Sequence, residues 1–410
     1  MLKIYICGPT VYNDPHIGNL RAITTFDLVL KANRFLGQKF KLVHNITDID
    51  DKIINKSIEL KVTEKEISEK YTEQYFELLK QLNIDTITDV EKVTDNIDVI
   101  IEYINKLVNL DQAYKGSNSD IWFNVKNNEK QYGSVSGQIL ENMEFDEKSN
   151  DKKFNADFAL WKSTSKGIQY NSPFGLGRPG WHTECCALID KHFGKDGIDV
   201  HGGGMDLTFP HHENENIQHF ALHNQNITKE WIRCGQINLD GVKMSKSLGN
   251  IIYPQDFFNK HGVEIYKLLI LTAKLSAPIN MSDELIENLK NIEQKYKKTM
   301  FSIFINHGRN LVGFENNKEI KEIFEALSKY DFAKYNLLLN EQIKNYNKTK
   351  DIQYARNIHK TLSIIHPTLT DVQNYNEFIQ IYSKWIELVK NKNFEQADIL
   401  RKKLQDSGLY

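Results

Sequence analysis

The sequence lacks three features that would assign it to a class at once. Its net charge is only −2 over 410 residues, so a nucleic acid could be bound by a local patch but not by bulk charge. No apolar run is long enough to cross a bilayer, and the longest, Leu268–Leu271, is flanked by lysines. The first residues also lack the pattern of a signal peptide. We therefore expect a cytoplasmic protein with no membrane partner.

Cysteine is scarce as well. The spacing of the four cysteines fits no disulfide framework, and thiols in a reducing cytosol are more often metal ligands or buried small residues. These cysteines are Cys7, Cys185, Cys186 and Cys234.

The order of β-rich and helical segments in the first part of the chain predicts an α/β fold. A β-rich run at Lys3–Ile6 is followed by a helical pattern from His16 to Gly37 and by a second β-rich run at Lys39–Asn45. This order is typical of a parallel βαβ unit, which places ligands at the carboxyl ends of its strands. We expect a Rossmann-like parallel sheet with Cys7 and Asn45–Asp48 at such ends.

Later segments depart from this rhythm. Glycines surround a β-like run within 113–157, which indicates a small insertion, and the chain is helical from about Asn288 onward. The expected organisation is a first Rossmann half at 1–112, an insertion at 113–157, a second half at 158–240, a region with a Lys- and Ser-rich loop at 241–300 and an all-α domain at 301–410.

Two separated motifs suit phosphate chemistry. The first, His16-Ile17-Gly18-Asn19, begins a helix, where glycine permits close approach of a base and the helix N-terminus attracts phosphate oxygens. On its own, this tetrapeptide is explained better by a helix cap with a packed histidine. The second, Lys243-Met244-Ser245-Lys246-Ser247, carries two lysines three residues apart, which suits a leaving pyrophosphate. A solvated basic loop is the alternative for this stretch.

Together these motifs resemble the paired signatures of class I aminoacyl-tRNA synthetases. Asn19 stands where the family pattern has histidine, and its amide can still donate a hydrogen bond. The resemblance implies that His16, Lys243 and Lys246 stabilise phosphate charge. It also implies that 241–300 contacts the tRNA stem and that the helical domain at 301–410 binds tRNA and its anticodon.

A metal site is a further possibility. His211 and Glu215 share one helical face at i, i+4, and with the thiols of Cys7 and Cys185 they would make a plausible zinc shell. No pair has a diagnostic spacing such as C-x-x-C, so buried cysteines beside a polar helix remain an alternative on spacing alone.

Five stretches are similar to cysteinyl-tRNA synthetases in particular. They are Tyr5–Tyr12, Asn45–Lys52, Gly180–Cys185, His201–Leu207 and Phe209–Glu215. The resemblance implies one zinc per chain on Cys7, Cys185, His211 and Glu215. It also implies an amino-acid pocket with Thr47, Trp181 and Asp206, and a nucleotide site with Gly8, Thr10, His16, Gly18, Asn19, Gly202, Gly203, Gly204 and Lys246.

The implied reaction joins L-cysteine to tRNA(Cys) with ATP and Mg²⁺, in a monomer without a DNA partner. Zinc would separate cysteine from serine, because sulfur is the softer ligand and its thiol ionises more readily. Two alternatives are a cysteine:aminosugar ligase of the mycothiol type and an inactive synthetase-like RNA-binding protein. Aromatic and basic residues of the helical tail could contact tRNA. Alternatively, the aromatic residues belong to the core and the basic residues to a solvated face. These residues are Tyr382, Lys384, Trp385, Arg401, Lys402 and Lys403.

Overall fold

The computed structural model describes residues 1–145, 149–244, 249–308, 311 and 317–410. Its internal contacts divide the chain into two compact units. Unit 1 holds residues 1–23 and 39–236, and unit 2 holds residues 24–38 and 237–410. Every helix among the described residues is too short or too polar to traverse a lipid bilayer.

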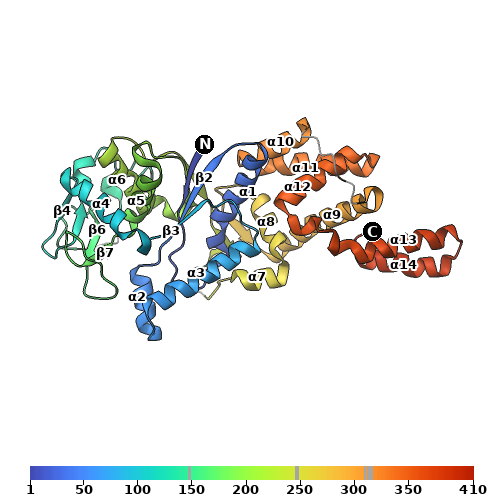
Figure 1. Ribbon diagram of the computed structural model, residues 1–410, viewed down its shortest axis with the longest axis horizontal. Helices are drawn as coiled ribbons and strands as arrows, with labels where there is room; N and C mark the ends of the chain where they lie inside the picture. Colours follow the sequence, from blue (N-terminus) through green and yellow to red (C-terminus); the bar gives the residue numbers. More distant parts are fainter. Residues whose placement is uncertain (146–148, 245–248, 309–310, 312–316) are drawn as a thin grey trace. The chain divides into compact units, whose positions relative to one another are not determined.

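A five-stranded parallel sheet organises unit 1, and the predicted α/β class is confirmed (Figure 1). The first strand is central: Ile4 pairs with Leu42 on one side and with Val200 on the other. Three of its five residues are buried, as expected of a strand covered on both faces. In spatial order the strands are β3 (Asp89–Lys92), β2 (Phe40–Ile46), β1 (Leu2–Ile6), β8 (Ile198–Gly204) and β9 (Thr228–Cys234).

Helices connect these strands and cover the sheet. In α4 the buried positions Ile97, Ile100, Ile104 and Leu107 recur at helical spacing and join one hydrophobic core with α5. The N-terminus of α3 is fixed by a capping box between Thr63 and Glu66. The helices of this unit are the start of α1 (Arg21–Phe35), α2 (Asp51–Leu60), α3 (Glu64–Gln81), α4 (Ile97–Asn109), α5 (Trp181–Phe193) and α6 (Glu213–His223).

A second, antiparallel sheet of four strands lies in the same unit. Its strands are β4 (Ala113–Lys115), β5 (Ile121–Phe123), β6 (Phe158–Ser163) and β7 (Gly177–Pro179). The last of these leads directly into α5, so this sheet positions the N-terminus of that helix.

Unit 2 is mostly helical. The hairpin of α13 and α14 is distinctive, because α13 is amphipathic and yet none of its residues is buried (Figure 1). Its small sheet consists of β10 (Ile237–Leu239), β11 (Val242–Lys243) and β12 (Ile279–Met281). Its helices are the rest of α1, α7 (Pro254–His261), α8 (Val263–Leu271), α9 (Asp283–His307), α10 (Lys318–Ser328), α11 (Phe332–Thr349), α12 (Ile352–Ile365), α13 (Asn376–Lys390) and α14 (Phe394–Asp406).

Candidate active site

Cys7 follows the central strand directly. Its backbone N–H donates to the carbonyl oxygen of Gly202 at 3.2 Å, which continues the β1–β8 pairing by one residue. The next residue must be glycine, because a Cβ on Gly8 would lie 1.6 Å from the carbonyl oxygen of Asn45. The close approach of β1 and β2 therefore sets where the Cys7 thiol points.

Cys185 comes from the first turns of α5. Gly180 precedes this helix, and a Cβ there would lie 1.9 Å from the carbonyl oxygen of Ala159. Glycine thus lets the helix start against β6. As a result, the Cys185 Sγ lies 3.7 Å from Nε2 of His211.

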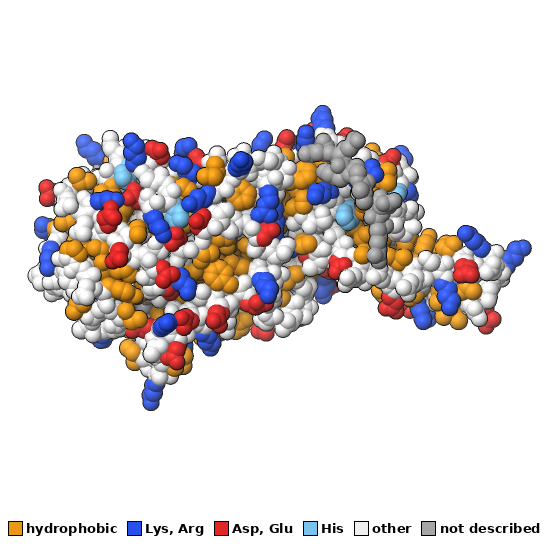
Figure 2. Space-filling model, viewed as in Figure 1, with side chains coloured by type: hydrophobic (Ala, Val, Ile, Leu, Met, Phe, Trp, Pro, Cys, Tyr) orange, Lys and Arg blue, Asp and Glu red, His pale blue; other side chains and the backbone are white. Residues whose placement is uncertain are grey.

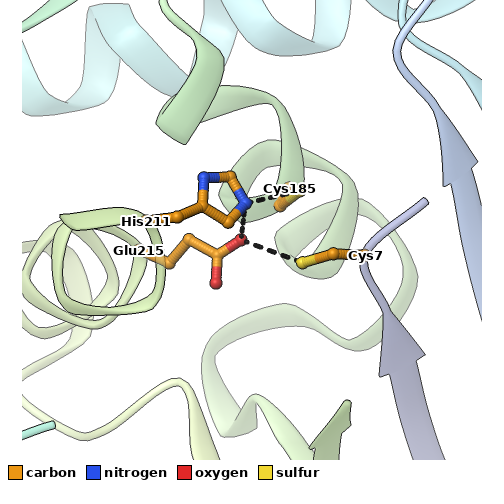
Figure 3. Close-up of side chains that lie close together, drawn as sticks. All are labelled: Cys7, Cys185, His211 and Glu215. Atoms are coloured by element: carbon orange, nitrogen blue, oxygen red, sulfur yellow. Dashed lines mark hydrogen bonds and ion pairs between the residues drawn. The ribbon is translucent and has the colours of Figure 1, made fainter. Parts of the chain in front are cut away.

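His211 and Glu215 lie at the start of α6, on the turn before it and on its first turn. The His211 Nε2 is 3.0 Å from Oε1 of Glu215, and the same carboxylate oxygen is 3.7 Å from the Cys7 Sγ. Figure 3 shows all four side chains pointing toward one another from β1, α5 and α6.

These four side chains fit a zinc ion. One ligand atom from each lies within 4.8 Å of the others, and Cys185, His211 and Glu215 are buried. Two thiolates, an imidazole and a carboxylate are all side chains that commonly bind zinc. The cluster expected from the sequence is therefore assembled in space.

The electrostatics also favour a cation. Burial raises the pKa of the Cys185 thiol, but hydrogen bonds with Cys7 and His211 outweigh burial and bring this pKa to about 7. Burial also disfavours the Glu215 carboxylate, yet His201 and His211 hold its pKa well below the usual range. Against the effect of burial, Glu215 raises the pKa of His211 to about 10. A metal ion would replace the proton on this imidazole.

The structure adds neighbours that the sequence did not single out. His182 Nδ1 lies 3.0 Å from His211 Nδ1, and His201 Nε2 lies 2.9 Å from the second oxygen of Glu215. His212 Nε2 is 3.8 Å from the Cys7 sulfur. These histidines stand in the motifs that carry the family resemblance, which was the available signal, but their partners could not be read from spacing.

The three expected pocket residues have different surroundings. Thr47 is buried and donates to Oε2 of Glu184 at 3.1 Å. Trp181 is 38% exposed and stacks on the His211 ring with centroids 4.3 Å apart. Asp206 is exposed in the turn after β8. Trp181 therefore borders the metal cluster through His211, whereas Thr47 contacts Glu184, the residue before Cys185. Among the described residues no contact links Asp206 to the cluster.

The expected nucleotide residues lie on loops at the carboxyl ends of the strands. Nδ1 of His16 accepts from the N–H of Gly18 at 3.0 Å, and Oδ1 of Asn19 accepts from the N–H of His16 at 2.8 Å. This reciprocal pair caps the helix start, so the capping interpretation and the nucleotide interpretation apply to the same residues. Thr10 bridges to Thr47, and Gly202, Gly203 and Gly204 end β8.

The basic loop is only partly described. Lys243 ends β11 in unit 2, where its carbonyl accepts from the Asn250 side chain at 3.2 Å. Lys246, the lysine expected to contact the transition state, lies outside the described residues.

Comparison with known proteins identifies the class. Residues 1–291 match the family of class I (C) tRNA synthetase catalytic domains. Methionyl-tRNA synthetase from Mycobacterium tuberculosis, solved with methionyl-adenylate, has the same fold, with a TM-score of 0.62 at 13% identity over 89% of this chain and 90% of that one. Residues 1–291 thus form a class I tRNA synthetase catalytic domain, and the fold agrees with that class.

Full-length relatives narrow the family. A cysteine--tRNA ligase of Mesomycoplasma hyopneumoniae strain 232 is 42% identical over 98% of this chain and 96% of its own length. One from Mycoplasmopsis pulmonis is 41% identical over the whole of this chain and 65% of its own, longer sequence. The chain belongs to the cysteine--tRNA ligase family.

Proposed function

We propose that this protein activates L-cysteine with ATP, forming cysteinyl-adenylate, and transfers the amino acid to the 3′ end of tRNA(Cys). The cluster of Cys7, Cys185, His211 and Glu215, at the carboxyl edge of a class I synthetase sheet, is the observation that carries this proposal. The membership of this protein in the cysteine--tRNA ligase family supports the same reaction.

The four clustered side chains would hold one zinc ion. Bound zinc supplies a soft Lewis acid that prefers a thiolate to a hydroxyl. A pocket that distinguishes one apolar group reaches only about 10–200-fold selectivity, so direct recognition of sulfur would separate cysteine from serine without editing.

The remaining residues would bind and orient the two substrates. Trp181, which stacks on His211, and Thr47, which donates to Glu184 beside Cys185, would shape the pocket, and Asp206 would attract the ammonium group. The substrate carboxylate is already ionised, so it can attack the α-phosphate without a general base.

Nucleotide binding would use the loops at the ends of β1 and β8. Gly8, Thr10 and Gly18 at the first end, and Gly202, Gly203 and Gly204 at the second, would let ATP approach the backbone closely. His16, Lys243 and Lys246 would stabilise charge on the departing pyrophosphate, with Asn19 supporting His16 and with Mg²⁺ accompanying ATP.

The hairpin α13–α14 would contact tRNA. Trp385 packs against Tyr382 and Tyr410 with ring centroids 5.5 and 5.3 Å apart, and none of the three is buried. Arg401, Lys402 and Lys403 are exposed on α14, and Figure 2 shows basic, acidic and apolar side chains interspersed on the hairpin. The exposed cations suit phosphate contacts and the aromatic rings suit base stacking.

The test is pyrophosphate exchange with each amino acid in turn. Cysteine should support exchange and serine should not. Exchange driven by another amino acid would overturn the substrate assignment.

Charging of tRNA separates the proposal from its alternatives. A tRNA ligase forms cysteinyl-tRNA from the adenylate, whereas acceptance of only an aminosugar would indicate the mycothiol type of ligase. An inactive RNA-binding relative would fail at the exchange step.

A further inference from the structure

The described residues contain two overlapping sets of potential metal ligands, and both include Cys7 and Glu215. The first set is completed by Cys185 and His211, the second by His201 and His212. Together the two sets offer six ligand side chains, more than the four or five that zinc usually takes, so one ion cannot use both fully. Some feature of the protein must therefore decide which of two adjacent histidines, His211 or His212, binds the ion.

Hydrogen bonding prepares His211 to be a ligand. Its Nε2 faces Cys185 and Glu215, while its Nδ1 lies 3.0 Å from Nδ1 of His182. If Nε2 of His211 gives its lone pair to a metal, the proton resides on Nδ1, and His182 can accept it. A ligating histidine normally donates its second ring N–H to a neighbour in this way.

His212 has the opposite surroundings. Its Nε2 faces the Cys7 sulfur, but its Nδ1 lies 3.2 Å from Nε of Arg233, which donates to it. A guanidinium has only donors, so Nδ1 of His212 must be the acceptor and the ring proton must be on Nε2. A protonated Nε2 has no lone pair for a metal and can instead donate to the Cys7 sulfur.

One aromatic and two acidic neighbours place Arg233 beside His212. It lies on β9, and its guanidinium covers the ring of Trp231 at 4.9 Å. The carboxylates of Glu213 and Glu215 attract it. The Trp231 ring also lies 4.8 Å from the fully buried His212 ring, so one aromatic side chain orients both partners.

We propose that Arg233 selects the ligand set: by donating to Nδ1 of His212, it withholds this histidine from the metal and confines the ion to Cys7, Cys185, His211 and Glu215. Arg233 is thus a positioning residue that acts through His212. The inference rests on the proposed metal site and deepens it, since a metal in the second set would have one thiolate ligand in place of two.

The sulfur count of the bound metal tests this inference. Full-length protein would be loaded with Zn²⁺ for X-ray absorption and with Co²⁺ for optical spectra, both without cysteine. Wild type should show two sulfur ligands. In Arg233→Met the mean number should fall below two, and the sulfur-to-cobalt charge-transfer intensity per bound metal should drop by up to about twofold.

Two further variants serve as controls. Lys229→Met removes an exposed cation from the same strand and should keep two sulfur ligands. The double variant Arg233→Met with His212→Gln lacks the second set and should regain them. Two sulfur ligands in Arg233→Met alone would overturn the inference.

A measurement on unmodified protein covers the case in which Arg233→Met does not fold. Nitrogen NMR of histidine-labelled, zinc-loaded wild type should find the His212 proton on Nε2, and a proton on Nδ1 would refute the proposal. By contrast, a wild type that binds no metal, or binds it without sulfur, would refute the proposed function itself.

Discussion

Cys7 and Cys186 differ in what surrounds the sulfur atom. The Cys186 Sγ donates to the carbonyl oxygens of His182 and Glu215 at 3.3 and 3.4 Å, so its thiol is used within the protein. The Cys7 Sγ instead faces a carboxylate and an imidazole at 3.7 and 3.8 Å. Only the second environment is that of a metal ligand.

We therefore expect Cys7→Ser to lose zinc. Serine is a harder and weaker ligand than a thiolate, so metal content measured by elemental analysis should fall from one per chain to well below half. The KM for cysteine should rise at least tenfold, whereas ATP binding measured by calorimetry should persist. Full metal content with an unchanged KM would count against the ligand set.

Cys186→Ser is the matched control. Its hydroxyl can replace the thiol as donor to the same two carbonyls, so zinc content and cysteine affinity should stay close to those of wild type.

At the scale of single residues, the sequence predicted the candidate metal ligands, because they lie in recognisable motifs. Cys7, Cys185, His211 and Glu215 were all named, and the structure brings their ligand atoms together. Arg233 was not, because its significance comes from one hydrogen bond to a residue 21 positions earlier, which no periodicity or spacing indicates.

Helix α8 carries an ionic cluster inside unit 2. The Glu264 carboxylate lies 2.6 Å from Nδ1 of His366, accepts from the Thr368 hydroxyl at 2.6 Å and lies 3.3 Å from the ammonium of Lys267. All except Thr368 are buried. Burial disfavours the charged carboxylate, but these partners outweigh burial and lower the pKa of Glu264 to about 2.

This lowered pKa predicts how stability depends on pH. The folded-state pKa lies below the ordinary value, so the contribution of Glu264 is present above about pH 4.5 and is lost as the pH falls toward 2. It amounts to about 3 kcal/mol near neutrality. Urea unfolding at a series of pH values should show that Glu264→Gln is destabilised by a similar amount at pH 7, with the difference shrinking in acid.

Glu287→Gln provides the comparison. Its ion pair with Lys290 on α9 is exposed, and such pairs contribute less than about 1 kcal/mol. Equal destabilisation by the two substitutions at pH 7 would show that the α8 cluster is not the stabilising feature.

Elements close together in sequence were predicted better than those far apart. Alternation of short apolar runs gave the parallel arrangement of β1 and β2, because that pairing needs only one connecting helix. The position of β8 beside β1 was not derivable, since nothing local relates strands nearly two hundred residues apart. Nothing local indicates that β9 and β10, which are two residues apart, belong to different sheets. The proposed domain boundaries stay predictions.

Across the whole molecule, the two reaction steps should respond to different surfaces. Replacing Arg401, Lys402 and Lys403 by alanine should raise the KM for tRNA in charging assays about tenfold or more, because phosphate contacts are lost. Pyrophosphate exchange should be unchanged, since it needs no tRNA. The salt dependence of tRNA binding should also become shallower, by up to about two in the log–log slope.

A control of equal charge is available on α10. Alanine at Lys318, Lys321 and Lys329 removes an equal number of positive charges from exposed positions on α10 and at the residue that follows it. If both triple variants weakened charging equally, tRNA binding would depend on general charge, and α14 would have no special role.

The ligands of the metal cluster come from distant parts of the chain, and this has a consequence during synthesis. Cys7 precedes Glu215 by 208 positions. At ribosomal rates of about 5–20 residues per second, the Cys7 thiol waits roughly 10 to 40 s before its last partner is made. During that interval the nascent chain cannot protect the Cys7 sulfur by metal binding. Nascent chains should therefore be oxidised more readily at Cys7 than the folded, metal-loaded protein.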